Sequence, residues 1–289
     1  QITDNGTAAT SLYKADAGLW HLEAANTYTG PTTIRGGTLA AVDGVSLPTA
    51  SNLLFDGSSG SLASTGTFSR TLGTGSGQVQ WSSHASGGFS AGGSPLTVDF
   101  GDGHVWGSTA GFLNAGALLL NGSGVAKSDV DVISSFEITQ GTDSSFNATT
   151  KVGSSTVTVT SGTTAGLTAG QVISGNANIP DGRYITAITG PTTFTLNSSA
   201  GVSAGTATAT NASGTGYRQI NVSDFTSIGA DFATISGNIS GAGNLAKEGN
   251  GILNLRGANT YTGQTLVRGG TLVVEALGSS GTAGATSVG

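Results

Sequence analysis

The amino-acid sequence predicts an all-β protein in which short strands stack in the successive coils of a solenoid, interrupted by a small inserted β-domain. Three observations predict this fold. The 289 residues include 49 glycines and only 9% charged residues, whereas ordinary soluble domains carry about 25%. One segment near the start recurs near the end, and short runs alternate apolar with polar residues. Small side chains with little charge suit thin stacked layers.

Composition also limits the function classes. The absence of cysteine excludes a disulfide framework, a cysteine-ligated metal and a thiol nucleophile. Net charge is −6 and the ten Lys and Arg residues are scattered, so we expect no nucleic-acid partner. No apolar run approaches the roughly 20 residues of a membrane-spanning helix. Because methionine is absent and Gln1 leads into polar sequence, we expect a processed chain or a fragment.

The internal repeat is the most informative feature of the sequence. Residues 12–44 align without a gap with residues 245–277, at a constant offset of 233 positions. That offset pairs Lys14 with Lys247, Leu22 with Leu255, Asn26 with Asn259 and Arg35 with Arg268. The chain therefore contains two copies of one structural unit.

Within each copy the apolar residues are spaced as in short half-buried strands, which we expect to be about four to six residues long. They are Trp20, Leu22, Ile34 and Leu39 in the first copy, and Leu253, Leu255, Val267 and Leu272 in the second. The Asn-Thr-Tyr-Thr-Gly and Gly-Gly steps supply residues that tolerate positive φ, so both are predicted turns. One copy then forms one or two solenoid coils.

These residues carry a family resemblance. The pattern that carries this resemblance is Lys-x-Gly-x-Gly-x-Leu-x-Leu-x-Gly-x-Asn-Thr-Tyr-Thr-Gly, followed by Gly-Gly-Thr-Leu. The repeat resembles the autotransporter-associated β-strand repeat. The second copy fits this pattern at Lys247, Gly249, Gly251, Leu253, Leu255, Gly257, Asn259 and Gly263. The first copy has Asp16 and Ala24 in place of two glycines, so we expect slightly different turns there.

The resemblance extends between the copies. Four segments are similar to segments of giant bacterial surface proteins that carry this repeat: SNLLFDG, TFSRTLGTGSGQVQW, GGFSAGGSPLTVDFGDG and YRQINVSD. With these segments, the resemblance covers roughly three quarters of the chain. The resemblance implies a right-handed parallel β-helix that is secreted and held at the cell surface. It implies no particular ligand.

Residues 142–216 differ from the rest of the chain in their sequence pattern and are predicted to form a separate small β-sandwich or barrel. This insertion divides the solenoid into residues 1–141 and 217–289. Val157 and Val159 alternate with threonines, which places both valines on one face of a strand. Residues 178–182, Asn-Ile-Pro-Asp-Gly, predict a turn. The strands expected here are 155–160, 171–174, 184–188, 193–196 and 206–210. Such an insertion projects sideways, where repeat proteins carry binding elements.

Acidic and histidine residues were weighed as catalytic or metal-binding groups. Asp129 and Asp131 share one strand face, as paired acids do in glycoside hydrolysis, but a solvated face explains them better. A Gly-Asp-Gly turn explains Asp99 and Asp102 better than a calcium site does, because the calcium-binding nonapeptide is not repeated. The histidines at positions 21, 84 and 104 lack the spacing of a zinc helix.

Other motifs have simpler explanations as well. Residues 88–92 read Gly-x-Ser-x-Gly, but glycines and Pro95 follow in place of the helix that a nucleophile elbow requires. The aromatic residues Trp20, Trp81, Trp106, Tyr28 and Tyr261 are expected to fill coils rather than to form a sugar-stacking platform. Arg35 and Arg268 recur at one position, which predicts a repeated packing or turn role. The Asn-x-Ser/Thr sites at positions 121 and 147 are expected by chance in this composition.

The sequence therefore predicts no catalytic, cofactor-binding or metal-binding residue, no cofactor and no enzyme activity. We expect an extracellular structural or adhesive protein, exposed at the cell surface or built into a fibre, with the inserted domain as a lateral contact site. A carbohydrate-active β-helix enzyme and a glycan-binding tail or surface module stay open as alternatives. Neither end resembles a cap, so we expect end-to-end self-association or continuation in a longer chain.

Overall fold

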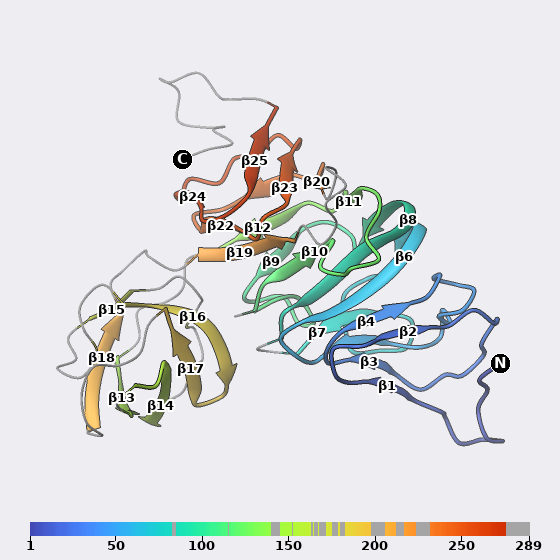
Figure 1. The fold of residues 1–289 in the computed structure, drawn as a ribbon, viewed down its shortest axis with the longest axis horizontal. Coiled ribbons are helices and arrows are strands. Elements are labelled where there is room, and N and C mark those ends of the chain that lie inside the picture. The colour runs from blue at the N-terminus through green and yellow to red at the C-terminus, as the bar shows by residue number, and fades with distance from the viewer. Residues whose placement is uncertain are drawn as a thin grey trace.

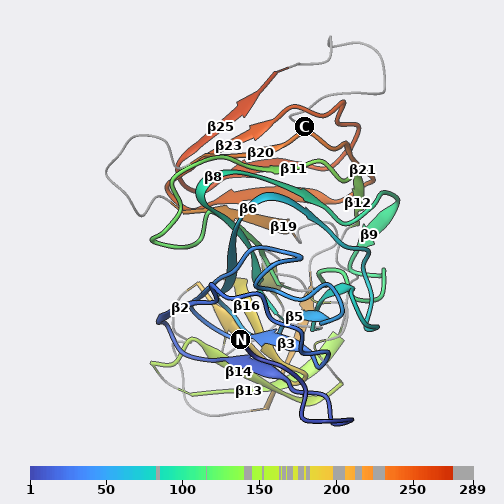
Figure 2. The ribbon, with the colours of Figure 1, turned by 90° about the vertical axis from the view of Figure 1, so that its right-hand side faces the viewer.

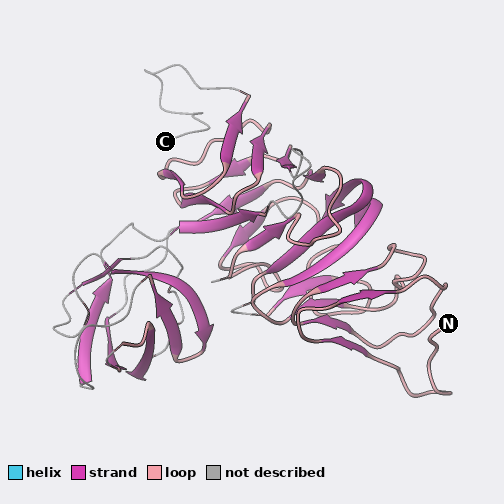
Figure 3. Cartoon of the chain, in the orientation of Figure 1, coloured by secondary structure: helices cyan, strands magenta, loops and turns pink. Residues whose placement is uncertain are grey.

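A computed structural model describes residues 1–82, 85–114, 116–139, 145–151, 153–162, 164, 167, 172–174, 179, 183–197, 206–211, 217–223 and 232–275. All the regular elements in these ranges are β-strands, and none is a helix (Figure 3). The all-β prediction is confirmed. It follows that no described segment forms a helix able to cross a bilayer.

The N-terminal part is built from two parallel stacks of strands. The first stack is β1 (Leu12–Lys14), β3 (Thr32–Ile34), β5 (Leu53–Phe55) and β7 (Val79–Trp81). The second is β2 (Leu19–His21), β4 (Thr38–Ala40), β6 (Gly60–Ser69) and β8 (Gly87–Asp99). Because the chain alternates between the stacks and each strand pairs with the one a coil later, this part is a β-solenoid (Figure 1).

The solenoid widens at β8, the longest strand, because its two halves pair with different strands. Residues 87–89 pair with β10 (Leu118–Leu120), and residues 96–98 pair with β11 (Val130–Val132). The β10 stack continues through β19 (Tyr217–Val222), β22 (Asn244–Glu248) and β24 (Thr265–Val267). The β11 stack continues through β20 (Phe232–Ile235), β23 (Ile252–Leu255) and β25 (Thr271–Val274), seen as successive layers in Figure 2. A third stack joins β9 (His104–Trp106), β12 (Phe136–Ile138) and β21 (Ile239–Ser240).

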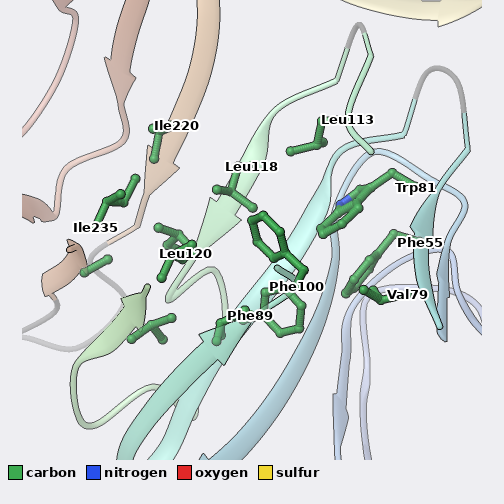
Figure 4. Close-up of a cluster of buried hydrophobic side chains, with 14 of the residues drawn as sticks. Phe55, Val79, Trp81, Phe89, Phe100, Leu113, Leu118, Leu120, Ile220 and Ile235 are labelled. Carbon is green, nitrogen blue, oxygen red and sulfur yellow. The ribbon is translucent and has the colours of Figure 1, made fainter. Parts of the chain in front are cut away.

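Aromatic rings fill the interior where the solenoid widens (Figure 4). Phe55 stacks on Trp81 with ring centroids 5.1 Å apart, and Trp81 meets Phe89 edge to face at 6.2 Å. Farther along the interior, Phe100 and Phe112 lie 5.2 Å apart. Offset and edge-to-face contacts of this kind add to the stabilisation from apolar burial. One continuous core thus runs from the N-terminal coils to the C-terminal coils.

Each copy of the repeat forms two coils, four strands in all. The four strands of the first copy span three residues each, fewer than expected, whereas in the second copy β22, β23 and β25 span five, four and four residues, as expected, and β24 spans three. Gly37 and Gly270, in the Gly-Gly steps, both have φ +65°, which confirms those turns. The Asn-Thr-Tyr-Thr-Gly steps require glycine for a different reason. Gly30 and Gly263 do not have positive φ, but a Cβ on either would overlap a backbone carbonyl oxygen of the preceding coil. Close stacking, not a left-handed turn, selects glycine there.

The inserted residues form a closed antiparallel barrel in the order β13-β14-β17-β16-β15-β18 (Figure 1). Its strands are β13 (Ser145–Thr150), β14 (Thr156–Ser161), β15 (Val172–Ser174), β16 (Arg183–Gly190), β17 (Thr193–Leu196) and β18 (Thr206–Asn211). Val157 and Val159 point into a core separate from that of the solenoid, as the alternation predicted. Five of the six strands were predicted and β13 was missed. The limits at 142 and 216, and most of the turn at 178–182, lie outside the described residues.

Candidate functional site

The junction between the barrel and the solenoid is the first candidate site. The strands on either side of the insertion stack directly on each other: Leu118 pairs with Ile220, Val130 with Ala233 and Phe136 with Ile239. These partners are 102 to 103 positions apart, whereas adjacent coils elsewhere pair at separations of 19 to 34. Residues 140–216 number 77, and without them Leu118 and Ile220 would be 25 positions apart. The solenoid therefore continues across the insertion in register.

A buried arginine ties together the chain segments that lead into and out of the insertion. Arg218, 5% exposed, donates from Nε to the Thr139 carbonyl at 3.1 Å and from Nη2 to the Thr139 hydroxyl at 3.1 Å. Its Nη1 donates to the Asn114 carbonyl at 2.7 Å. Burial lowers the pKa of Arg218 to about 10, so the guanidinium is still charged at neutral pH. Nothing in the sequence singled this residue out.

A cleft of about 500 Å³ lies between the solenoid and the barrel. The solenoid contributes Arg35, Asp56, Ser58 and Gln219 together with glycine, alanine and serine, and β16 contributes residues 186–189. A second depression, of about 420 Å³, shares Arg35 and extends to Tyr13, which is 51% exposed. Arg35 donates to the Tyr13 hydroxyl at 3.2 Å. Of these residues, the sequence had marked Arg35 alone.

A pair of buried lysines is the most regular polar feature of the two repeats. Lys14 Nζ donates to the carbonyls of Ala15, Asp16 and Gly36 at 2.9, 2.8 and 3.0 Å. Lys247 Nζ makes the same three contacts, to Glu248, Gly249 and Gly269, at 2.7, 2.8 and 3.0 Å. Both side chains are fully buried.

Burial lowers the pKa of both lysines, to about 8 for Lys247. The nearby carboxylates of Asp16 and Glu248 oppose that shift. The alignment had paired the two lysines, but a charged residue on a short strand did not predict burial. Their recurrence at the end of corresponding strands was the signal available.

The paired acids Asp129 and Asp131 bond to hydroxyl groups one coil away. Thr234 Oγ1 donates to both carboxylate oxygens of Asp129, at 3.0 and 3.2 Å. Ser236 Oγ donates to both oxygens of Asp131, at 2.8 and 3.0 Å. Burial raises the pKa of Asp129, and the Asp131 carboxylate adds to that rise while the Thr234 hydrogen bond opposes it. Neither acid lines the cleft, and both join successive coils.

The other acidic and histidine candidates are held by turns. Asp99 Oδ1 accepts from the Gly101 N–H at 2.9 Å, and Asp102 Oδ1 accepts from the Ser135 N–H at 2.6 Å. His104 Nε2 lies 2.9 Å from the Phe100 carbonyl oxygen. His21 is exposed on β2, and position 84 is outside the described residues. Within the described ranges no three His, Asp or Glu side chains gather as a metal site.

The remaining motifs are structural. Ser90 is buried within β8 and bonds to the Ser61 hydroxyl at 2.8 Å, so Gly-x-Ser-x-Gly forms no nucleophile elbow. Four of the five proposed platform aromatics are buried: Trp81, Trp106, Tyr28 and Tyr261. Trp20, 44% exposed, is the exception. The four buried rings fill coils, as expected, whereas the prediction was wrong for Trp20, which is exposed on β2.

The arginines Arg35 and Arg268 share one backbone position but not their side-chain partners. Both backbone amides donate to the carbonyl of the buried lysine in the preceding coil, Lys14 or Lys247, at 2.8 and 2.9 Å. The Arg35 guanidinium reaches Tyr13, whereas Arg268 pairs with Glu248 at 2.9 Å. The repeated role is therefore confined to the backbone.

The asparagine at position 121 is not available for glycosylation. Asn121 is fully buried with φ +51°, and its Oδ1 accepts from the Ala91 N–H at 3.0 Å. Its Nδ2 donates to the carbonyls of Ser128 and Phe232 at 2.9 and 2.7 Å. The side chain thus connects the coils on both sides of the insertion. Asn147 lies in β13 of the barrel.

Comparison with known families identifies the repeat. Residues 12–41 and 245–274 each match the family described as passenger-associated-transport-repeat. The matched residues are the four strands of each copy, from β1 to β4 and from β22 to β25. The chain thus carries two copies of this repeat, which confirms the resemblance stated from sequence. Comparison with curated proteins and with solved structures gave no significant match.

Proposed function

From the two copies of the passenger-associated transport repeat, we propose that this chain is the β-solenoid rod of an extracellular, surface-displayed passenger. Its function is structural: the rod carries the barrel on its side, where the barrel makes adhesive contacts. The repeat supports the passenger assignment, and the position of the barrel supports the display role.

The observation that carries this proposal is the register across the insertion. Because β10, β11 and β12 pair with β19, β20 and β21 as neighbouring coils, the rod needs nothing from the barrel for its ladder of backbone hydrogen bonds. The barrel has its own closed sheet and its own apolar core. A module attached in this way varies or binds without changing the rod.

Deletion of residues 140–216 tests the proposal. The Arg218 bonds to Thr139 hold the two cut ends close together, so a linker of about three glycines spans them. We expect the shortened chain to keep its β-sheet circular dichroism and to unfold in one cooperative transition. Loss of that transition would show that the barrel is integral to the rod.

A matched control removes residues 116–139 in place of the barrel. This segment contains β10 and β11, which join β8 to the later coils, and β12, which joins β9 to β21. We expect that deletion to abolish folding of the C-terminal coils, because three strands of the ladder are missing.

No enzymatic activity is proposed. The paired acids Asp129 and Asp131 bond to hydroxyls of the next coil, and Ser90 bonds to Ser61 inside the sheet. A hydrolase needs such groups free to meet a substrate.

End-to-end association is a second part of the proposal. Among the described strands, β1, β2, β24 and β25 each pair on one side only. Open strand edges pair with further strands, supplied here by another copy or by more coils of a longer chain. If copies associate, light scattering of the 289-residue chain shows a mass that rises with concentration. A constant monomer mass at high concentration would contradict association between copies.

A further inference from the structure

We propose that the cleft between the solenoid and the barrel binds a neutral oligosaccharide. The proposal adds a ligand to the structural role above and does not rest on it. The cleft occupies about 500 Å³ and meets the second depression at Arg35, which gives a groove suited to an elongated ligand. Ligand sites occur preferentially where two domains meet.

The chemistry of the lining favours sugar hydroxyls. Arg35 and Gln219 offer N–H donors, Asp56 offers a carboxylate acceptor, and Ser58, Thr186 and Thr189 offer hydroxyls that donate or accept. These groups come from β16 and from both the early and the late coils of the solenoid. A ligand with many hydroxyls satisfies donors and acceptors placed on both walls.

The charge balance argues for a neutral ligand. Among the described residues that line the cleft, Arg35 is the one cation and Asp56 the one carboxylate, and the adjoining depression adds the carboxylate of Asp16. A phosphate-bearing or strongly anionic ligand needs a cluster of cations, which this lining lacks. A guanidinium and a carboxylate together match the donor and acceptor character of neighbouring hydroxyl groups.

The lining also fits a sugar better than a peptide. Gly57 and Gly116 line the cleft, and neither position can carry a side chain, because a Cβ would overlap the backbone oxygens of Arg35 and Ala85. Within the described part of the lining, the apolar side chains are three alanines and Ile188, which offer little apolar surface to a peptide side chain. Tyr13, which is half-exposed and lines the adjoining depression, adds an aromatic ring of the kind that packs against a pyranose.

The test uses isothermal titration of the full chain with four neutral hexasaccharides: maltohexaose, cellohexaose, chitohexaose and mannohexaose. We expect at least one to bind with a dissociation constant between micromolar and millimolar. Arg35→Ala and Asp56→Ala each weaken binding by about tenfold or more, because each removes a charge-assisted hydrogen bond. Arg256→Ala is the matched control, since Arg256 forms an exposed pair with Glu275 outside the cleft.

A variant on the barrel side gives an independent readout. Thr189 is exposed on β16 and lines the cleft, so the longer side chain of Thr189→Arg takes up space there without altering any residue of the solenoid. It should abolish binding and leave the melting temperature unchanged. The proposal would be overturned if none of the four sugars bound. It would also be overturned if the affinity for the sugar stayed unchanged in Arg35→Ala, Asp56→Ala and Thr189→Arg. Binding of unstructured peptides in the cleft without any sugar would overturn it too.

Discussion

The two copies of the repeat have the same internal contacts but different surroundings. In both, a buried lysine donates to three carbonyls, and a buried tyrosine bonds to a threonine four residues later, at 2.7 Å for Tyr28 and 2.6 Å for Tyr261. The second copy lies on the coil that contains β19 and β20, whereas β1 and β2 begin their stacks in the first copy. The sequence differences between the copies follow this difference in neighbours.

Two positions demonstrate the effect of a preceding coil. Gly249 and Gly257 lie so close to that coil that a Cβ would overlap the carbonyl oxygens of Val222 and Gly237. The first copy has Asp16 and Ala24 at these positions, where no strand of the described chain precedes β1 and β2. Asp16 keeps the left-handed turn, with φ +61° against +77° for Gly249. The turn is thus retained, contrary to the expectation of a different one.

Replacing the buried lysines gives the largest expected effect on this comparison. Lys247→Met leaves three buried carbonyls without their donor, and we expect the free energy of unfolding to fall by about 3 kcal/mol. Lys14→Met should cost about half as much, because the first coil is covered on one side and frays more easily. Denaturant unfolding followed by circular dichroism measures both.

Lys127→Met is the control for the lysine variants. Lys127 is exposed, so its replacement should change the stability by less than about 0.5 kcal/mol. If Lys14→Met and Lys247→Met lowered the free energy of unfolding equally, the preceding coil would not account for the difference between the two copies.

Exchanging the residues at one turn position sharpens the comparison. Gly249→Asp introduces a left-handed aspartate whose Cβ overlaps the Val222 oxygen, and we expect a loss of about 2 kcal/mol. Asp16→Gly removes the strain of a left-handed non-glycine residue, because glycine adopts this positive φ without steric cost. We expect this variant to raise the free energy of unfolding by up to about 1 kcal/mol. Thermal unfolding of the two single variants and of the double exchange measures these values. A gain from Gly249→Asp would refute the steric argument.

Much of this fold could be predicted from the sequence, because local patterns of apolar and polar residues and an internal repeat indicate the strands of the solenoid and of the barrel. The alternation around Val157 and Val159 located a barrel strand, and the offset between Lys14 and Lys247 located the two-coil unit. The candidate site could not be predicted in this way. Arg218 and the cleft residues depend on segments about 80 or more positions apart, such as Thr139 with Arg218, and no local pattern encodes such contacts.

The smallest expected effect is a pH dependence to which both buried lysines contribute and in which Lys247 of the second copy has the larger part. Lys247 has its pKa lowered to about 8 by burial, against 10.5 for an ordinary lysine. Between these values the unfolded chain binds more protons than the folded chain, so the free energy of unfolding rises with pH. Below about pH 8 the folded chain also holds the proton, and the contribution of this group is constant.

The measurement is denaturant unfolding between pH 8 and pH 9.5, a window chosen to avoid the tyrosines. Burial raises the pKa of Tyr28 and Tyr261 above the ordinary value of 10.0, so both lower stability only at higher pH. One group changes the free energy of unfolding by at most about 1.4 kcal/mol per pH unit. Since three carbonyls accept from the Lys247 ammonium, we expect a total rise of about 1 kcal/mol or less. Lys247→Met should reduce this rise to the part that Lys14 contributes, and Lys127→Met should preserve it. A wild-type stability that stays constant across the window would mean that the carbonyls keep the pKa of this lysine near or above 10.5, because both the folded and the unfolded chain would then hold the proton up to pH 9.5.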